Sequence, residues 1–231
     1  MKGIRIPEGN AAAVAVGGVN VWNAGGWDVE WEYDSIISEL PDTSIWEYPV
    51  GTGVVRYQSD GFDDDGLMLE SQYSGYDYAM FRPRDYLARM GKKAILEVDF
   101  VAIDTVSGTN GFRLILGEGD SGAASGRGLQ CAFRYNYVYP VPAVPDSYLH
   151  VMYADAALTV DTDSAYVEPD TLHTVRMELD TVTGVNKIKL DGELIATLAN
   201  DQLSTTYADK ICCMTQKGDI PIRAFRYRAL L

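Results

Sequence analysis

The sequence predicts an all-β protein, built as a two-sheet antiparallel jelly-roll β-sandwich. From residue 28 onward, short segments of alternating apolar and polar residues recur about every ten residues, separated by turn signals. The 22 glycines and 15 tyrosines, together with many valines and threonines, favour strands and turns over helices. Only residues 83–91, "PRDYLARMG", suit one or two helical turns, which would end at Gly91.

The clearest strand pair is residues 173–198, "HTVRMELDTVTGVNKIKLDGELIATL". Apolar and charged side chains alternate over residues 175–180, and residues 187–191 repeat the alternation. The apolar members are Val175, Met177, Leu179, Ile188 and Leu190. Each strand is therefore expected to bury one face, as a two-layer sandwich requires.

This hairpin resembles that of the laminin-G-like and concanavalin A-like jelly rolls. In those proteins a strand that opens with His or an aromatic residue and Thr-Val leads to a strand that ends in Asp-Gly. The matching residues here are His173, Thr174, Val175, Asp191 and Gly192, whereas Leu172 stands where relatives often have Trp. The segments "DDDGLMLES", "ILEVDF" and "IRAFRYR" resemble further strands of the superfamily. The resemblance implies a fold and not an activity, because the superfamily includes lectins, hydrolases, lyases and structural modules.

The chain is expected to form one large domain preceded by an arm. The strand pattern covers residues 28–231, a common length for a single β-sandwich. Residues 9–27 carry no charge, are too rich in glycine for a stable helix, and are too apolar to remain in water. We therefore assign residues 1–27 to an extended arm that packs on its own domain or on a neighbouring chain. Its candidate contact residues are Val14, Val16, Val19, Trp22 and Trp27.

Composition argues against several partners and compartments. The formal net charge is -14, so phosphate backbones and anionic lipids are repelled, and neither nucleic acid nor a membrane is an expected partner. The three cysteines, Cys131, Cys212 and Cys213, do not suit a disulfide framework and favour synthesis in a reducing compartment. Pro7 and Glu8 interrupt the N-terminal apolar stretch, so no signal peptide is expected. We expect synthesis in the cytoplasm, for a protein that could be part of a virion.

A candidate catalytic strand is "AILEVDFVA", residues 94–102, which places Glu97 and Asp99 on one face. The resembling glucanases have the pattern Glu-x-Asp-x-Glu, or the same with one extra residue before the last Glu. A retaining glycosidase needs two carboxyl groups about 5–5.5 Å apart, one as nucleophile and one as acid/base. Val101, or Ala102 in the longer version, occupies the position of that second Glu. No catalytic residue is therefore assigned.

A ligand-binding face is another interpretation of the same strand. Two later strands, near residues 112–118 and 131–139, carry outward polar residues that would join Glu97 and Asp99 if the strands are neighbours. Planar polar groups beside an aromatic platform suit a glycan. The alternative is a solvated sheet face with cross-strand ion pairs. The candidate ligand-binding residues are Glu97, Asp99, Arg113, Arg134, Asn136, Tyr137 and Tyr139.

The acidic segment "DGFDDDG", residues 60–66, is a candidate calcium site, because calcium favours clustered carboxylates on turns. Its register does not fit an EF-hand, since Gly61 occupies the first ligand position. The alternative is an acidic hairpin turn without metal. The candidate ligands are Asp60, Asp63, Asp64 and Asp65, and no other cofactor is expected.

Three functions follow in order of preference. The first is a non-enzymatic structural protein of a homo-oligomer or larger assembly, such as a virion decoration or tail component. It rests on the uncharged arm, the cysteines and the incomplete catalytic pattern. The second is a carbohydrate-binding, lectin-like module, and the third is a glycoside hydrolase or polysaccharide lyase.

Overall fold

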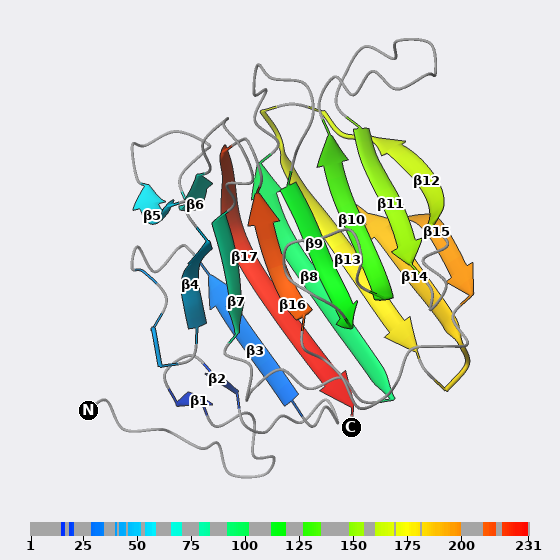
Figure 1. Cartoon of the computed structure of the whole chain (residues 1–231), viewed down its shortest axis with the longest axis horizontal. Helices are drawn as coiled ribbons and strands as arrows, with labels where there is room; N and C mark the ends of the chain where they lie inside the picture. The colour runs from blue at the N-terminus through cyan, green and yellow to red at the C-terminus, as the bar shows by residue number, and fades with distance from the viewer. Residues whose placement is uncertain are drawn as a thin grey trace.

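The protein forms two antiparallel sheets that pack face to face (Figure 1). The computed structural model describes residues 15–16, 19–20, 29–34, 40, 42–44, 46–51, 54–58, 66–70, 79–83, 92–101, 112–118, 127–134, 148–154, 160–168, 170–180, 182–199, 210–215 and 219–230. These ranges contain strands β1 to β17 and no helix, so none of their segments is a helix able to span a membrane. The predicted all-β class is confirmed.

The first sheet has ten strands, eight of which follow the order β1-β2-β3-β17-β8-β13-β14-β15. The beginning of β17 also pairs with β6, and β6 pairs with β5. The bounds are β1 Ala15–Val16, β2 Val19–Asn20, β3 Val29–Asp34, β5 Val54–Gln58, β6 Gly66–Glu70, β8 Lys93–Val101, β13 Leu172–Asp180, β14 Val185–Leu190, β15 Glu193–Ala199 and β17 Asp219–Leu230. The last strand of the chain therefore lies in the middle of this sheet, beside β8.

The second sheet has seven strands in the order β12-β11-β10-β9-β16-β7-β4 and lies in front of the first in Figure 1. The bounds are β4 Trp46–Gly51, β7 Ala79–Pro83, β9 Phe112–Glu118, β10 Arg127–Arg134, β11 Tyr148–Ala154, β12 Val160–Tyr166 and β16 Lys210–Thr215. Pro83 thus ends a strand, so the predicted helix is wrong at its first residue. Its other residues, 84–91, lie outside the described ranges.

The core lies between the sheets and is made by the inward faces of their strands. On β8, Leu96, Val98 and Phe100 are fully buried, while the residues between them are partly exposed. Trp46 on β4 makes edge-to-face contacts with two rings of the other sheet, Tyr33 at 6.5 Å and Phe225 at 5.4 Å between centroids. These rings join the two layers near one margin of the sandwich.

The predicted hairpin at residues 173–198 is confirmed. Strand β13 pairs with β14, with Val175 opposite Leu190 and Met177 opposite Ile188. These apolar residues face the core, and the charged residues between them face away from the seven-stranded sheet. We refer to this second side of the ten-stranded sheet as its outer face.

Part of the N-terminal arm adds to the ten-stranded sheet of its own chain. Strands β1 and β2 pair with Val16 opposite Val19, and β2 pairs with β3 with Val19 opposite Trp31. This pairing fits the interpretation in which the arm packs on its own domain. The other candidate contact residues, Val14, Trp22 and Trp27, lie outside the described ranges.

Gly66 begins β6 at a point where β17 leaves no room for a side chain. A Cβ atom at residue 66 would lie 2.7 Å from the backbone oxygen of Ile222, closer than real Cβ contacts. We expect Gly66→Ala to lower the free energy of unfolding by about 1–3 kcal/mol, because β6 and β17 must move apart. Chemical denaturation measures the change, with Thr197→Ala at an exposed site on β15 as the control. An unchanged midpoint for Gly66→Ala would contradict the close approach.

Candidate functional site

The outer face of the ten-stranded sheet carries a row of charged side chains that crosses five strands. The pairing register places Glu32, Arg226, Glu97, Arg176 and Lys189 opposite one another on β3, β17, β8, β13 and β14. Directly opposed residues of antiparallel strands have Cβ atoms about 4.5–5.5 Å apart, within reach of ion pairing. We refer to these five residues as the charged row.

Glu97 is the centre of the charged row, and each of its carboxylate oxygens accepts from a different guanidinium group. Arg226 Nη1 lies 3.1 Å from Oε1, and Arg176 Nη1 lies 3.3 Å from Oε2. Arg226 also donates through Nε to Glu32 at 3.1 Å. The Glu97 carboxylate is therefore fixed between two cations, and both of its oxygens are in use.

Asp99, two residues further along β8, also has a partner for each of its carboxylate oxygens. Its Oδ2 lies 2.9 Å from Arg226 Nη2, and its Oδ1 accepts from the Thr174 hydroxyl at 2.8 Å. Burial lowers the pKa of Arg226, but its hydrogen bonds and charge interactions with Asp99, Glu32 and Glu97 outweigh this effect and raise the pKa overall. Arg226 therefore stays charged and ties three carboxylates together, as in the predicted face with cross-strand ion pairs.

The strands that carry the other predicted ligand-binding residues are not neighbours of β8. Arg113 and Arg134 lie on β9 and β10 of the seven-stranded sheet, whereas β8 lies between β17 and β13 in the other sheet. The expectation that these strands share one face is wrong, because the chain crosses between the two layers after β8. Asn136, Tyr137 and Tyr139 lie outside the described ranges. A ligand-binding role for any of the seven residues stays a prediction.

The predicted calcium ligands, Asp60, Asp63, Asp64 and Asp65, also lie outside the described ranges. Within the part of the chain that the structure describes, no group of three or more His, Cys, Asp or Glu side chains could hold a metal ion. Calcium binding by the acidic segment therefore stays a prediction.

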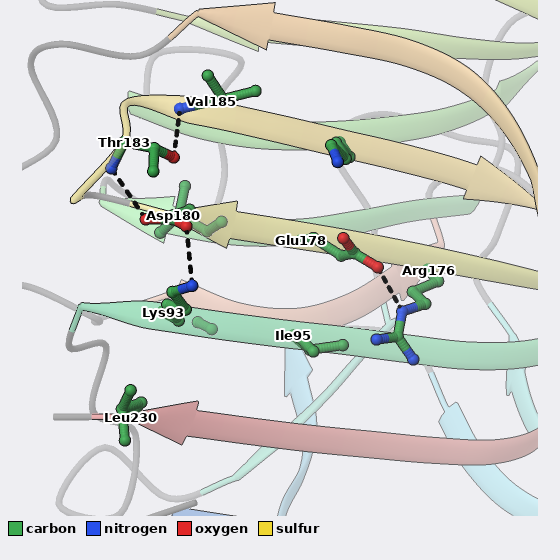
Figure 2. A pocket seen from close by; sticks show the side chains of 11 residues that line it. Lys93, Ile95, Arg176, Glu178, Asp180, Thr183, Val185 and Leu230 are labelled. Atoms are coloured by element: carbon green, nitrogen blue, oxygen red, sulfur yellow. Dashed lines mark hydrogen bonds and ion pairs between the residues drawn. The ribbon is translucent and has the colours of Figure 1, made fainter.

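A groove of about 720 Å³ opens on the outer face, where β13 turns into β14 (Figure 2). It lies beside the charged row and shares Arg176 with it. Aliphatic side chains of Ile95, Val185 and Leu230 line it together with polar groups. The polar lining residues are Lys93, Arg176, Glu178, Asp180, Thr183 and Lys187. Sequence reasoning missed this groove, although strand alternation already places Lys93 and Ile95 on the same side as Glu97.

Glu178 lies in the groove and is neutralised by two cations. Its Oε1 accepts from Arg176 Nε at 2.7 Å and from Lys189 Nζ at 3.0 Å. Partial burial raises the pKa of Glu178, but the hydrogen bonds and charges of these two cations outweigh it, so the pKa lies below its usual value. Glu178 is therefore ionised and paired at neutral pH.

Asp180 lies at the end of the groove and organises the turn between β13 and β14. Its Oδ1 accepts from the backbone N–H groups of Val182 and Thr183, both at 3.0 Å, and its Oδ2 lies 3.2 Å from Lys93 Nζ. Slight burial raises the pKa of Asp180, but the Thr183 amide, Lys93 and the Val182 amide outweigh it, so the pKa lies below its usual value. Both oxygens of Asp180 therefore already have partners within the protein.

A separate polar cluster surrounds His173 at the other end of β13. The buried ring has Nδ1 2.7 Å from Asp191 Oδ2 and Nε2 2.8 Å from the backbone oxygen of Glu168. The other carboxylate oxygen of Asp191 accepts from the Thr174 backbone N–H at 2.8 Å, and the Asp191 N–H donates to the Thr174 oxygen at 2.8 Å. The residues that resemble the superfamily hairpin therefore connect two turns by hydrogen bonds.

Comparison with known proteins shows the fold. No protein-family model matches the chain, and no curated protein matches it in sequence. The carbohydrate recognition domain of Emp47p has a TM-score of 0.61 and 13% identity, covering 87% of this chain and 95% of that one. The exoplasmic/lumenal domain of VIP36, in a form bound to Ca2+ and Man3GlcNAc, has a TM-score of 0.60 and 12% identity, covering 87% and 88%.

A protein of unknown function from Shewanella oneidensis MR-1 has a TM-score of 0.57 and 14% identity, covering 87% of this chain and 86% of that one. Together these structures show that the chain has the concanavalin A-like jelly-roll fold. The resemblance predicted from the hairpin is thereby confirmed at the level of the fold.

Proposed function

We propose that the protein is a non-enzymatic, lectin-like module that binds carbohydrate. The observation that carries the proposal is the groove on the outer face, which combines an aliphatic lining with planar charged groups. Sugars present both hydroxyl groups and C–H faces, and such sites recognise them through fixed polar groups and apolar packing. The similarity of the fold to carbohydrate recognition domains supports the same proposal.

The state of the carboxylates on β8 supports binding without catalysis. A general acid needs a proton to donate, and both oxygens of Glu97 instead accept hydrogen bonds from guanidinium groups. Buried Val101 occupies the position of the second glutamate in the shorter glucanase pattern, so a second carboxyl group at the required separation is not supplied there.

A structural role in an assembly is the second candidate. Among the described residues, four large apolar side chains are more than half exposed: Tyr166 at 52%, Leu172 at 59%, Val182 at 68% and Leu194 at 55%. Of these, Tyr166, Leu172 and Leu194 each lie within three residues of a member of the His173 cluster. Exposed apolar side chains near one another favour contact with another protein. A homo-oligomer, including the proposed virion component, stays part of this second candidate.

A glycan array tests the proposed function. The intact protein is expected to bind at least one class of glycan, and Ile95→Glu is expected to abolish the signal because it places a charge among the aliphatic groove residues. Thr197→Ala on β15 is the control and should bind like the wild type. The array is read with and without calcium, so that the acidic segment is tested as well.

Two further readouts separate the alternatives. A reducing-end assay on every bound glycan should show no release of sugar, and release that disappears in Glu97→Gln would contradict the non-enzymatic proposal. Light scattering of the same preparation gives the oligomeric state. A defined oligomer that binds no glycan would reject the lectin-like proposal in favour of the assembly role.

A further inference from the structure

We infer that the ligand of the groove is an acidic sugar, whose carboxylate is bound by Lys187, with Arg176 as a second donor to the same sugar. This inference rests on the proposed function and names the class of its ligand. It follows from the charges that line the groove, from the two donors that remain available there, and from its size and aliphatic lining.

The groove is positive on a strongly negative protein. Its described lining contains three cations, Lys93, Arg176 and Lys187, and two anions, Glu178 and Asp180, whereas the whole chain has a net charge of -14. Such a local reversal of charge offers complementarity to an anion. The difference of one positive charge suits a short acidic sugar of low charge better than a heavily sulfated chain, which the rest of the surface would repel.

Lys187 is the cation that the groove leaves available. It lies opposite Glu178 in the pairing of β14 with β13, but Glu178 accepts from Arg176 and Lys189 instead. Among the described residues, none makes an ion pair or hydrogen bond with the exposed Lys187 side chain. Its ammonium group can therefore bind a ligand without first losing a partner within this part of the chain.

Arg176 supplies a second donor beside it. Nε donates to Glu178 and Nη1 donates to Glu97, while the described residues provide no acceptor for Nη2. The side chain is 34% exposed, and Figure 2 shows its guanidinium group extending from β13 towards β8. A guanidinium group held by two carboxylates is fixed in orientation, so its remaining Nη2 donor is placed before a ligand binds.

The two donors reach different parts of the groove. Arg176 lies opposite Lys189, and Lys187 lies two residues before Lys189 on β14, so Arg176 and Lys187 are diagonal neighbours. Because the Arg176 guanidinium group is held towards β8, Lys187 is the donor for the carboxylate and Arg176 Nη2 is a donor for another polar group of the same sugar.

The remaining lining fits a small sugar. Ile95, Val185 and Leu230 offer aliphatic surface to the C–H face of a ring, and the groove volume of about 720 Å³ lies within the range of small-ligand sites. The described lining contains no aromatic residue, so charge and not ring stacking has to provide most of the affinity. Binding is therefore expected to weaken strongly as salt is added.

Titration calorimetry with the full chain tests the inference, using digalacturonate and its neutral counterpart galactobiose as probes. We expect digalacturonate to bind about tenfold more tightly than galactobiose, and Lys187→Ala and Lys187→Glu each to weaken its binding by about tenfold. Lys210→Glu, which makes the same charge change on β16 of the other sheet, is the matched control and should leave binding unchanged. Unfolding midpoints of all variants verify that they are folded.

The outcomes separate this inference from the proposed function. If a neutral glycan binds as well as digalacturonate, the protein is still a lectin but the acidic class of its ligand is wrong. If digalacturonate binding is unaffected by Lys187→Glu, the assignment of the carboxylate to Lys187 is wrong. If Lys187→Glu and Lys210→Glu lower the affinity for digalacturonate equally, the effect comes from the overall charge of the protein. That result would contradict binding at Lys187. Binding of a sulfated disaccharide but not of digalacturonate would contradict the assignment of a carboxylate as the acidic group that is bound. If no glycan binds, acidic or neutral, both the inference and the proposed function fail.

Discussion

Trp46→Ala is expected to lower the free energy of unfolding by about 3–5 kcal/mol, the largest effect of a single substitution that we predict. Trp46 is 2% exposed and lies on β4, the edge strand of the seven-stranded sheet, yet its ring contacts Tyr33 and Phe225 of the other sheet. Alanine removes the side chain that joins the layers and leaves a cavity that fixed strands cannot close. Domains are stable by only about 5–15 kcal/mol, so a large part of the stability would be lost.

Denaturant unfolding followed by circular dichroism measures this effect without relying on tryptophan fluorescence. Trp46→Phe retains an aromatic ring and is expected to lose roughly half as much as Trp46→Ala. Leu40→Ala is the control for a large apolar residue that is 48% exposed, and it should change stability by less than about 0.5 kcal/mol. Equal stability of Trp46→Ala and Leu40→Ala would contradict a role of Trp46 in joining the layers.

The sequence predicts where the strands of this protein lie along the chain better than it predicts which strands pair with one another. Alternation with a period of two is local, so the buried face of β8 and the hairpin of β13 and β14 follow from the residues themselves. The choice of sheet is not local, because β8 pairs with β17 from the far end of the chain. Grouping Arg113 and Arg134 with Glu97 failed for this reason: each strand pattern is compatible with either layer.

The candidate site was predictable only in part. Alternation identified Glu97 and Asp99 as neighbours on one face, and the structure places them so. Arg226, which binds both carboxylates, was missed, although it belongs to the closing strand "IRAFRYR", whose outward arginine could have been matched to them. The groove was not predictable from alternation alone, since its shape depends on how the turn after Asp180 is held.

The charged row has a physical consequence for the groove. Individual ion pairs on an exposed sheet contribute little stability, but a chain of them in register restricts the rotamers of its long side chains. Arg176 belongs to both features, so its guanidinium group is oriented before a ligand arrives. Because Arg176 is already ordered, its side chain loses less conformational entropy when a ligand binds than an unrestrained arginine would lose.

Asp191→Gly is expected to lower the free energy of unfolding by about 2 kcal/mol, even though glycine suits the backbone there better than aspartate does. Residue 191 has a φ of 51°, in the left-handed region that glycine adopts without strain. The substitution nevertheless removes the two oxygens that accept from the Thr174 N–H and from His173 Nδ1. His173 is buried, so its ring nitrogen would lose its partner with little access to water.

Asp191→Asn separates the side-chain contribution from the backbone contribution. Asparagine tolerates the left-handed conformation and retains one oxygen acceptor but lacks the negative charge, so about half of the loss is expected. Gly192→Ala, at the next residue with a φ of 85° and open space around it, measures the backbone strain alone. If Asp191→Gly is as stable as the wild type in denaturant unfolding, the carboxylate does not hold the two turns together. A loss that is the same for Gly and Asn would assign the effect to the charge of Asp191 and not to its hydrogen bond with Thr174.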